Sequence, residues 1–254
     1  MLEDELINWR GLRALYLKEV RRFLVVWVQT LLGPVIGTLL LLAVFVVVLQ
    51  RRGAEVAGVS YLEFIAPGLI MMTMLQNAFA NPSSSILISK LNGTSSDVLS
   101  APLGPVEMTT GYALAGVTRA IVVGAAVSLA LLPLDALHAA IPSRILSFGL
   151  AGALLFALLG VAGGIYAEKM EHIAFMSNVI VAPLTILSGT FYSLQQLPEA
   201  LRTVALANPV FYLIDGFRQG FLGVSESDPV VAWAVVLGAN LAVGGLCLYL
   251  FATG

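Results

Sequence analysis

The sequence predicts an all-α integral membrane protein with six transmembrane helices, an N-terminal amphipathic helix at the membrane interface, and a re-entrant helical hairpin between spans five and six. Three observations predict this class. Of the 254 residues, 59% are hydrophobic and only 11% are charged, whereas about 25% of the residues of a typical globular domain are charged. Long stretches without a charge recur along the whole chain. Between the last two of them lies an apolar segment that is broken by prolines and charges.

The six predicted spans are the stretches that carry no charge or only one. Five of them contain no Asp, Glu, Lys or Arg, and the other is interrupted only by Arg119. Each is long enough for a helix of about 20 apolar residues, which crosses a hydrocarbon layer of about 30 Å. In chain order they are 23–50, 64–89, 108–134, 145–167, 173–198 and 229–254. They leave no room for a sizeable soluble domain, so we expect residues 1–254 to form a single membrane domain.

Basic residues before the first span predict the orientation. Membrane proteins keep Lys- and Arg-rich flanks in the cytoplasm, which places the N-terminus there, and six spans return the C-terminus to the same side. Arg51 and Arg52 fall on the outer side in this topology and run against it. The basic residues of the N-terminal flank are Arg10, Arg13, Lys18, Arg21 and Arg22.

Residues 6–22 predict an amphipathic helix. Apolar side chains recur at spacings of three and four, whereas Arg10, Lys18, Arg21 and Arg22 lie on the opposite arc. A basic helix with aromatic anchors directly before a span lies in the plane of the membrane interface. The sequence leaves open whether this helix is only an anchor or also docks a cytoplasmic partner. Its apolar positions are Leu6, Trp9, Leu12, Tyr16, Val20 and Phe23.

A short helix is predicted at residues 94–101, in the cytoplasmic loop between spans two and three. Thr94 or Ser95 can cap it and Asp97 falls in its first turn, while Pro102 ends it. The Gly and Pro residues around it indicate a short helix held rigidly between two spans.

Two polar features interrupt the spans. The first is the run Asn81-Pro82-Ser83-Ser84-Ser85 near the end of span two, which serves either hydrogen bonds between packed helices or a pathway. The second is Arg119, about 18 Å from the cytoplasmic end of its helix at about 1.5 Å per residue. An ionisable residue at such depth faces the bundle interior or a wet cavity. It is either a functional residue or a structural one bonded to backbone carbonyls or to groups beside Glu107.

The segment 195–221 predicts two half-length helices. Asn208-Pro209 separates them, and each reaches only about half of the membrane at about 1.5 Å per residue. This pattern predicts a re-entrant hairpin that dips back from the outer face. Asp215 and Arg218 are three residues apart, so we expect them to pair on one face of the second helix.

Catalytic and nucleotide-binding motifs are missing from the sequence. No Lys is followed by Ser or Thr, so there is no GxxxxGK[ST] loop for ATP phosphates. EKMEH at 168–172 lacks the first His of an HxxEH metal motif, so an interfacial role is favoured for His172. There is no nucleophile–base pair to name and no basic patch for nucleic acid. We therefore expect no catalytic residue, metal site, bound cofactor or nucleic-acid partner, and an intramembrane enzyme is disfavoured.

An ion-coupled secondary transporter or channel for hydrophobic solutes is the alternative class. Each half of the chain holds three hydrophobic segments, as the inverted repeats of such transporters do. The hairpin, however, has no counterpart in the first half, and no line of Asp, Glu or His runs through the spans.

Four stretches resemble the ABC-2-type permease family, the membrane halves of bacterial ABC exporters, and the resemblance covers nearly the whole chain. They are YLEFIAPGLIMM (61–72), LNGTSSDVLSAPLGPVEMTTGY (91–112), LSGTFYSLQQLP (187–198) and LANPVFYLIDGFRQG (206–220). The last two are the most specific. The positions in register with the family are Gly189, Pro198, Asn208, Pro209, Asp215 and Arg218.

The resemblance implies a permease subunit of an ATP-driven exporter in the bacterial cytoplasmic (inner) membrane. It implies a second permease copy, which we expect to be identical, and two ATP-binding cassette ATPase subunits that carry ATP and Mg. The ATPase-coupling residues it implies are Trp9, Arg13, Lys18, Arg21, Thr94, Asp97, Leu99 and Pro102. The gate and pathway residues are Arg119, Asn208, Pro209, Tyr212, Asp215 and Arg218. The chain departs from the family in ending without a basic tail.

The mostly aliphatic and aromatic residues that could face a pathway favour an amphipathic or lipid-linked substrate. A glycan on a lipid carrier and a hydrophobic drug are both of this class.

Overall fold

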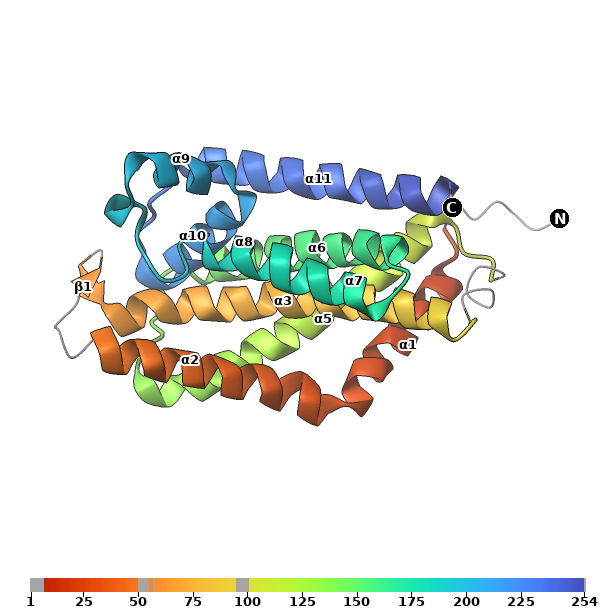
Figure 1. Ribbon diagram of the computed structural model, residues 1–254, viewed down its shortest axis with the longest axis horizontal. Coiled ribbons are helices and arrows are strands. Elements are labelled where there is room, and N and C mark those ends of the chain that lie inside the picture. Colours follow the sequence, from red (N-terminus) through yellow and green to blue (C-terminus); the bar gives the residue numbers. More distant parts are fainter. Residues whose placement is uncertain (1–6, 50–54, 57, 95–100, 254) are drawn as a thin grey trace.

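Helices that run along one long axis make up most of the protein (Figure 1). The computed structural model describes residues 7–49, 55–56, 58–94 and 101–253. Within these ranges five helices are long and apolar enough to span a membrane, and Met170–Ile186 is a shorter apolar helix. The five are Val28–Val47, Tyr61–Leu91, Pro105–Leu134, Pro142–Tyr166 and Pro229–Thr253. The predicted all-α membrane class is confirmed, and the count of six spans stays a prediction.

The first part of the chain forms two helices with a bend between them. Helix α1 (Trp9–Val25) has Val26 as its C-cap residue, and a π-helical turn η1 (Val28–Leu32) leads into α2 (Gly33–Leu49). The predicted start of the first span at residue 23 is wrong, because Phe23 belongs to the buried stripe of α1. That stripe has the spacing of one helix face, which keeps α1 helical through Phe23.

Helix α3 (Tyr61–Leu91) forms the centre of the bundle. In its most apolar window 78% of the residues are buried, against 17% in Val28–Val47 and in Pro229–Thr253. A capping box starts the helix: Glu63 N donates to Ser60 Oγ at 3.3 Å, and Ser60 N donates to Glu63 Oε2 at 3.1 Å. The short strands β1 (Glu55–Val56) and β2 (Val59–Ser60) pair directly before it.

Helices α5 (Pro105–Leu131) and α6 (Pro142–Tyr166) pack against α3 through glycines. A Cβ atom added to Gly160 would lie 2.3 Å from the carbonyl oxygen of Phe79, and one added to Gly116 would lie 2.9 Å from that of Ala78. Small residues let helix backbones approach closely in membranes, where packing rather than hydrophobic burial drives association. The tight α3–α5–α6 core follows from these positions.

A broken apolar helix follows α6. It consists of α7 (Met170–Phe175), a π-helical turn η4 (Met176–Val181) and α8 (Ala182–Ile186). Although the uncharged window runs to residue 198, the helix ends at Ile186, because Gly189 adopts a left-handed φ of 77° and the 3-10 helix η5 (Leu194–Gln196) follows. The predicted fifth span is thus wrong in its last part, and Met170–Ile186 is about 26 Å long at about 1.5 Å per residue.

Two short helices occupy the predicted hairpin segment. Helix α9 (Glu199–Ala207) and helix α10 (Pro209–Leu222) are separated at Asn208, whose side chain accepts a hydrogen bond from Val210 N at 3.0 Å. Pro209 at the first helical position needs no such partner. The dip of this pair into the membrane stays a prediction.

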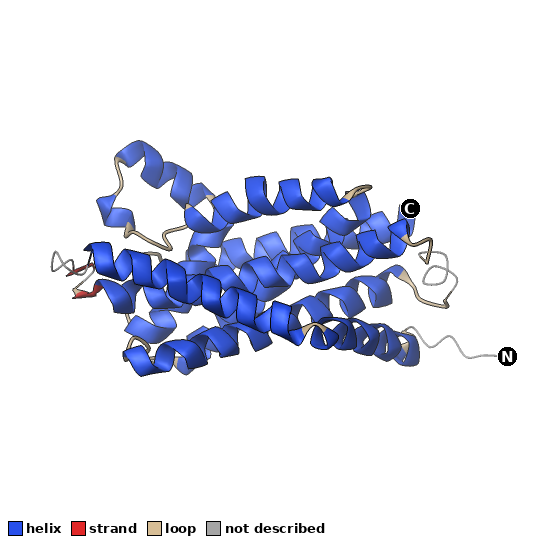
Figure 2. Ribbon diagram, turned by 60° about the horizontal axis from the view of Figure 1, so that its bottom comes forward, coloured by secondary structure: helices blue, strands red, loops and turns tan. Residues whose placement is uncertain are grey.

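The long axis has two distinct ends. Helix α1 and the end of α11 (Pro229–Thr253) lie at one end, here called the α1 end, and α9 with the β-hairpin lies at the other, here called the α9 end (Figure 1). Turning the molecule leaves this division unchanged (Figure 2). The predicted interface helix and the predicted hairpin are therefore at opposite ends of the bundle.

Candidate functional site

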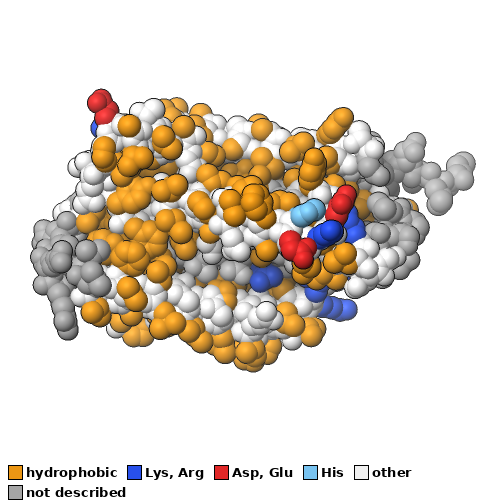
Figure 3. Space-filling view, viewed as in Figure 1, with side chains coloured by type: hydrophobic (Ala, Val, Ile, Leu, Met, Phe, Trp, Pro, Cys, Tyr) orange, Lys and Arg blue, Asp and Glu red, His pale blue; other side chains and the backbone are white. Residues whose placement is uncertain are grey.

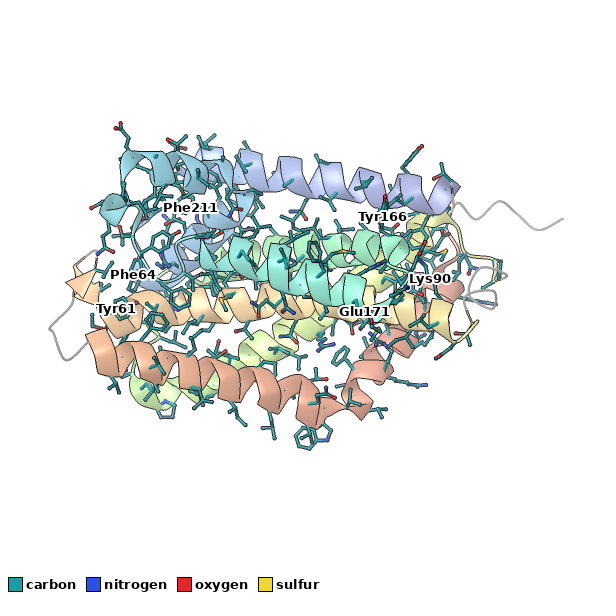
Figure 4. The ribbon with its side chains drawn as sticks, in the orientation of Figure 1. Tyr61, Phe64, Lys90, Tyr166, Glu171 and Phe211 are labelled. Atoms are coloured by element: carbon teal, nitrogen blue, oxygen red, sulfur yellow. The ribbon has the colours of Figure 1, made fainter. Side chains whose placement is uncertain are left out.

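Polar side chains gather at three levels of the bundle: the α1 end, the middle of α3, and the α9 end. Figure 4 shows the side chains along the bundle, with Lys90, Tyr166 and Glu171 toward the α1 end and Tyr61, Phe64 and Phe211 toward the α9 end. On the face seen in Figure 3, most charged atoms lie toward the α1 end, and hydrophobic side chains cover much of the rest.

Glu19 and Arg22 fasten α1 to α3. Glu19 is fully buried, accepts from Ser85 Oγ at 2.8 Å and pairs with Arg22 Nε at 3.2 Å. Arg22 Nη2 donates to the backbone oxygen of Asn81 at 2.7 Å and to its Oδ1 at 3.1 Å. A buried carboxylate is tolerated only when it is paired and hydrogen-bonded. The predicted place of Arg22 on the solvent arc is therefore wrong: this side chain turns inward because Glu19 and α3 compensate it.

These contacts also answer the question left open for the run 81–85. Asn81 and Ser85 bond to α1, and Ser83 Oγ donates to the carbonyl oxygen of Phe79 in its own helix at 2.8 Å. Asn81, Ser83 and Ser85 thus bond within and between packed helices, while the buried Asn81 Nδ2 has no partner among the described residues.

Asn8 joins the start of α1 to the start of α5. Its Oδ1 accepts from Gly11 N at 2.9 Å and so caps α1. Its Nδ2 donates to the carbonyl oxygen of Pro102, and its backbone N donates to Glu107 Oε1, both at 2.9 Å. The two segments that were expected to couple to a partner, the interface helix and the loop before α5, are therefore bonded to each other.

The described part of the predicted coupling surface is exposed. Trp9 is 65% exposed. The side chains of Arg13, Lys18, Arg21, Thr94 and Pro102 are also exposed. Asp97 and Leu99 lie outside the described residues, as does most of the predicted coupling helix 94–101.

Arg119 and Asn77 meet in the middle of the bundle. Arg119 lies about 21 Å from the start of α5 at about 1.5 Å per residue, is partly buried, and donates from Nη2 to Asn77 Oδ1 at 3.1 Å. Asn77 Nδ2 donates to the carbonyl oxygen of Thr73 at 3.0 Å, which fixes the orientation of the amide. The bond to a side chain of α3 differs from both structural partners expected from the sequence, a backbone carbonyl and a group beside Glu107.

Two hollows flank α3 at this level. One of about 200 Å³ lies between α2 and α3, and one of about 260 Å³ lies between α3 and the η4–α8 segment. Gln76 and Asn77 line both of them. The other polar side chains of the linings are Thr38, Thr73, Ser177 and Asn178.

At the α9 end, Asp215 holds the connection between α10 and α11. It is 2% exposed and accepts from Ser225 Oγ at 2.7 Å, from Ser227 N at 3.0 Å and from Glu226 N at 3.1 Å. Glu226 Oε2 in turn accepts from Leu194 N at 2.7 Å, which adds the connection before α9.

Arg218 holds the start of α3 and the end of α8. It is 3% exposed, donates from Nε to the carbonyl oxygen of Phe64 at 3.1 Å and from Nη2 to that of Gly189, and lies 3.9 Å above the Phe64 ring. The predicted Asp215–Arg218 pair is therefore wrong. Arg218 is satisfied by backbone carbonyls, and Asp215 by backbone N–H groups and serine hydroxyls, instead of each by the other.

The remaining gate candidates bond the α9–α10 pair to the end of α8 and α10 to α9. Asn208 Nδ2 donates to Ser188 Oγ at 2.8 Å and to the carbonyl oxygen of Leu184 at 3.2 Å. The Tyr212 hydroxyl donates to the carbonyl oxygen of Leu206 at 3.0 Å. The structure thus brings the predicted gate residues of 208–218 together at the α9 end, and it places Arg119 apart from them.

Sequence reasoning missed several residues of these groups. Asn8 directly before an amphipathic helix is an N-cap signal, and Glu19 three residues before Arg22 is a pairing signal. Gln76 and Asn77 are adjacent amides in the middle of an uncharged stretch. The role of Glu107 depends on a contact distant in sequence, and no local pattern indicates it.

Known proteins resemble the chain over most of its length. The sequence model of the ABC-2 type transporter family matches residues 10–222. The inner membrane transport permease YadH of Escherichia coli (strain K12) is 34% identical over 251 residues, which are 98% of this chain and 97% of that protein. Nodulation protein J of Rhizobium leguminosarum bv. viciae is 26% identical over 239 residues, 91% of this chain and 87% of that protein.

Proposed function

Because this chain belongs to the ABC-2 type transporter family, we propose that it forms, with a second permease copy, the export pathway of an ATP-driven transporter. The chain is the membrane permease subunit and carries no ATPase domain, so two separate ATP-binding cassette subunits bind ATP and Mg on the cytoplasmic face. By similarity to YadH, its place is the bacterial inner membrane.

The observation that carries the proposal is the joint that Asn8 makes between α1 and the start of α5. A subunit that receives force from outside the membrane needs its receiving surface bonded to the spans. Asn8 bonds to Pro102 and Glu107 at 2.9 Å, and the Glu19–Arg22 pair bonds α1 to α3. The exposed residues Trp9, Arg13, Lys18 and Arg21 remain available to a partner on the other side of α1.

The mechanism follows from these bonds. Closure of the ATPase pair pushes α1 and the segment 94–101, and the bonded spans tilt as rigid bodies. Helix α3 packs against α10 as well as against α5 and α6, so its tilt reaches the α9 end. There the α9–α10 hairpin gates the outer mouth of the pathway.

The proposed topology has six spans, with Met170–Ile186 as the fifth and with both termini in the cytoplasm. The position of α1 and the end of α11 at one end of the bundle supports it, since an even number of crossings returns the chain to its starting side (Figure 1). The α9–α10 pair then lies on the outer side, as a re-entrant hairpin requires.

The substrate we propose is amphipathic or lipid-linked. Helices α2 and α11 bury only 17% of their most apolar windows, so large apolar faces are left for lipid or for the second copy. A pathway between two such faces, with amide and hydroxyl side chains at mid-depth, suits a molecule with an apolar tail and a polar head.

Purification of the chain from its own membranes, followed by mass spectrometry of the co-purifying proteins, tests the proposal. We expect a stoichiometric subunit with a GxxxxGK[ST] loop and vanadate-sensitive ATP hydrolysis by the complex. A protein that purifies alone and transports only under an ion gradient would contradict the proposal.

Replacement of Asp97 and Leu99 by Ala tests the coupling surface within the same complex. We expect hydrolysis to continue while transport is lost, with the unfolding temperature unchanged. Normal transport by these variants would show that the coupling assignment is wrong.

A further inference from the structure

Arg119 carries a charge in the middle of the bundle that no carboxylate of the described residues balances. The ion pairs found among those residues involve Lys18, Arg22 and His138, and none includes Arg119. Its one hydrogen bond to a described residue goes to the neutral amide of Asn77, and its buried Nε atom has no partner there. An unbalanced cation at this depth is costly and marks a site by default.

Two other arginines of the bundle, Arg22 and Arg218, show how a structural arginine can be satisfied in this protein. Arg22 pairs with Glu19 and bonds to the backbone of α3. Arg218 is enclosed by the carbonyl oxygens of Phe64 and Gly189. Arg119 has neither kind of compensation among the described residues, so its guanidinium keeps donor capacity for a further acceptor.

Asn77 links this guanidinium to the two hollows, although Arg119 itself is not among the residues that line either of them. The amide is one hydrogen bond from Arg119, and together with Gln76 it lines both hollows. Their volumes, about 200 and 260 Å³, are below the roughly 300–1,000 Å³ of pockets that enclose a drug-sized molecule. Each can hold a head group, while a tail has to lie outside along the apolar faces of α2 and α8.

We propose that Arg119, Asn77 and Gln76 form a binding site for the anionic head group, a phosphate or a carboxylate, of an amphipathic substrate. A guanidinium binds such groups through charge-assisted hydrogen bonds that fit their geometry. The anion balances the charge of Arg119, and the neutral amides fix its position without adding a second charge. This inference rests on the proposed transport function and narrows its substrate class.

The test measures binding of two probes that share one tail. Native mass spectrometry of the full-length protein, together with whatever subunits co-purify, counts bound dodecyl phosphate and bound dodecyl glucoside at matched concentrations. The variants are Arg119→Gln, Arg119→Lys and Gln76→Leu. The control is Lys169→Gln, which removes one exposed cation that lines neither hollow. Binding of the probe is measured on the permease itself. Loss of binding therefore contradicts this inference alone, whereas absence of an ATPase partner would contradict the proposed function.

We expect the wild-type protein to prefer dodecyl phosphate and Arg119→Gln to bind it about tenfold more weakly, as loss of a charge-assisted hydrogen bond predicts. Arg119→Lys keeps the preference for the phosphate head and Gln76→Leu weakens it, while Lys169→Gln leaves it unchanged. Dodecyl glucoside binding stays the same in every variant. If Arg119→Gln does not fold, Gln76→Leu carries the same test, because it is also expected to weaken the preference for the phosphate head.

Three results would overturn the proposal. One is unchanged phosphate preference in Arg119→Gln or in Gln76→Leu. Another is equal loss of both probes in Arg119→Gln, which would make Arg119 a purely structural link. The third is occupation of the site by a different anion. Phosphatidylglycerol added to the sample would then exclude dodecyl phosphate, or inorganic phosphate would compete for the site as well as dodecyl phosphate does.

Discussion

The two ends of the bundle use their charged residues differently. At the α1 end, side chains of α1 bond directly to other helices: Glu19 to Ser85, Tyr16 to Thr118 at 3.0 Å, and Arg22 to the backbone oxygen and the side chain of Asn81. At the α9 end, Arg218 bonds to the carbonyl oxygens of Phe64 at the start of α3 and of Gly189, and Asp215 accepts from backbone N–H groups and serine hydroxyls of the connection 223–228.

The difference indicates two mechanical roles. Side-chain bonds between two helices make a joint that carries the motion of one helix to the other while each stays intact. Bonds from one helix to the backbone of irregular segments fix the shape of those segments, because buried N–H and C=O groups there have no partner within a regular element. The α1 end is therefore suited to transmit force, and the α9 end is suited to hold an outer gate in shape.

The largest effect on stability is expected at the α9 end. Arg218→Gln removes the donors of two carbonyl oxygens and the stacking on Phe64, and should lower the free energy of unfolding by about 3 kcal/mol. Thermal unfolding in detergent, followed by tryptophan fluorescence, measures it. Arg202→Gln on the exposed side of α9 is the control and should change stability by less than about 0.5 kcal/mol. Equal stability of the two variants would show that the contacts of Arg218 with Phe64 and Gly189 do not stabilise the α9 end.

A smaller loss of stability is expected at the α1 end. Glu19→Gln and Arg22→Gln should each cost about 1–2 kcal/mol, since the first leaves Arg22 without its carboxylate and the second leaves the buried Glu19 with only Lys18 Nζ, at 3.7 Å, as an ion-pair partner among the described residues. Their double-mutant cycle should show a coupling energy of about 1 kcal/mol, as residues in one network do. Denaturant unfolding of the wild type, the two single variants and the double variant gives this coupling energy. Strictly additive effects would show that Glu19 and Arg22 do not act together as a joint.

The smallest effect on stability is expected for Asn8, where cap and joint can be separated. Asn8→Ser keeps an oxygen that caps α1 but removes the donor to Pro102, so it should cost only a few tenths of a kcal/mol. Asn8→Ala removes both the cap and the donor to Pro102, keeps the backbone bond to Glu107, and should cost about 1 kcal/mol. If the joint matters for coupling, both variants lower the transport per ATP hydrolysed to a similar degree. Full coupling in Asn8→Ser would limit the role of Asn8 to capping.

Most of the helices could be predicted from the sequence because charge is excluded from membrane-spanning stretches. Helix ends were harder, because composition does not change there: the segment after Ile186 is as apolar as the helix before it, and a left-handed glycine ends the helix. The break at Asn208 was predictable because Asn-Pro combines a cap with a residue that has no N–H group.

The partners of the charged residues could not be predicted from spacing. Asp215 and Arg218 have the spacing of a helical pair, yet Asp215 bonds to the connection that directly follows its helix, and Arg218 bonds to Phe64, 154 residues away. Arg22 has a local partner in Glu19, but its inward orientation depends on Asn81 of α3. Local rules therefore located the charged residues, and the tertiary fold decided what each of them binds.

The central claim is that motion of α1 reaches the α9 end through the joint. Spin labels on Thr203→Cys, an exposed position of α9, in a Cys247→Ser background report the distance between the two permease copies in the ATPase complex. We expect vanadate trapping to shift this distance in the parent protein and to leave it unchanged in Glu19→Gln/Arg22→Gln, although the ATPase stays bound and hydrolyses ATP. The same shift in both proteins would contradict the account.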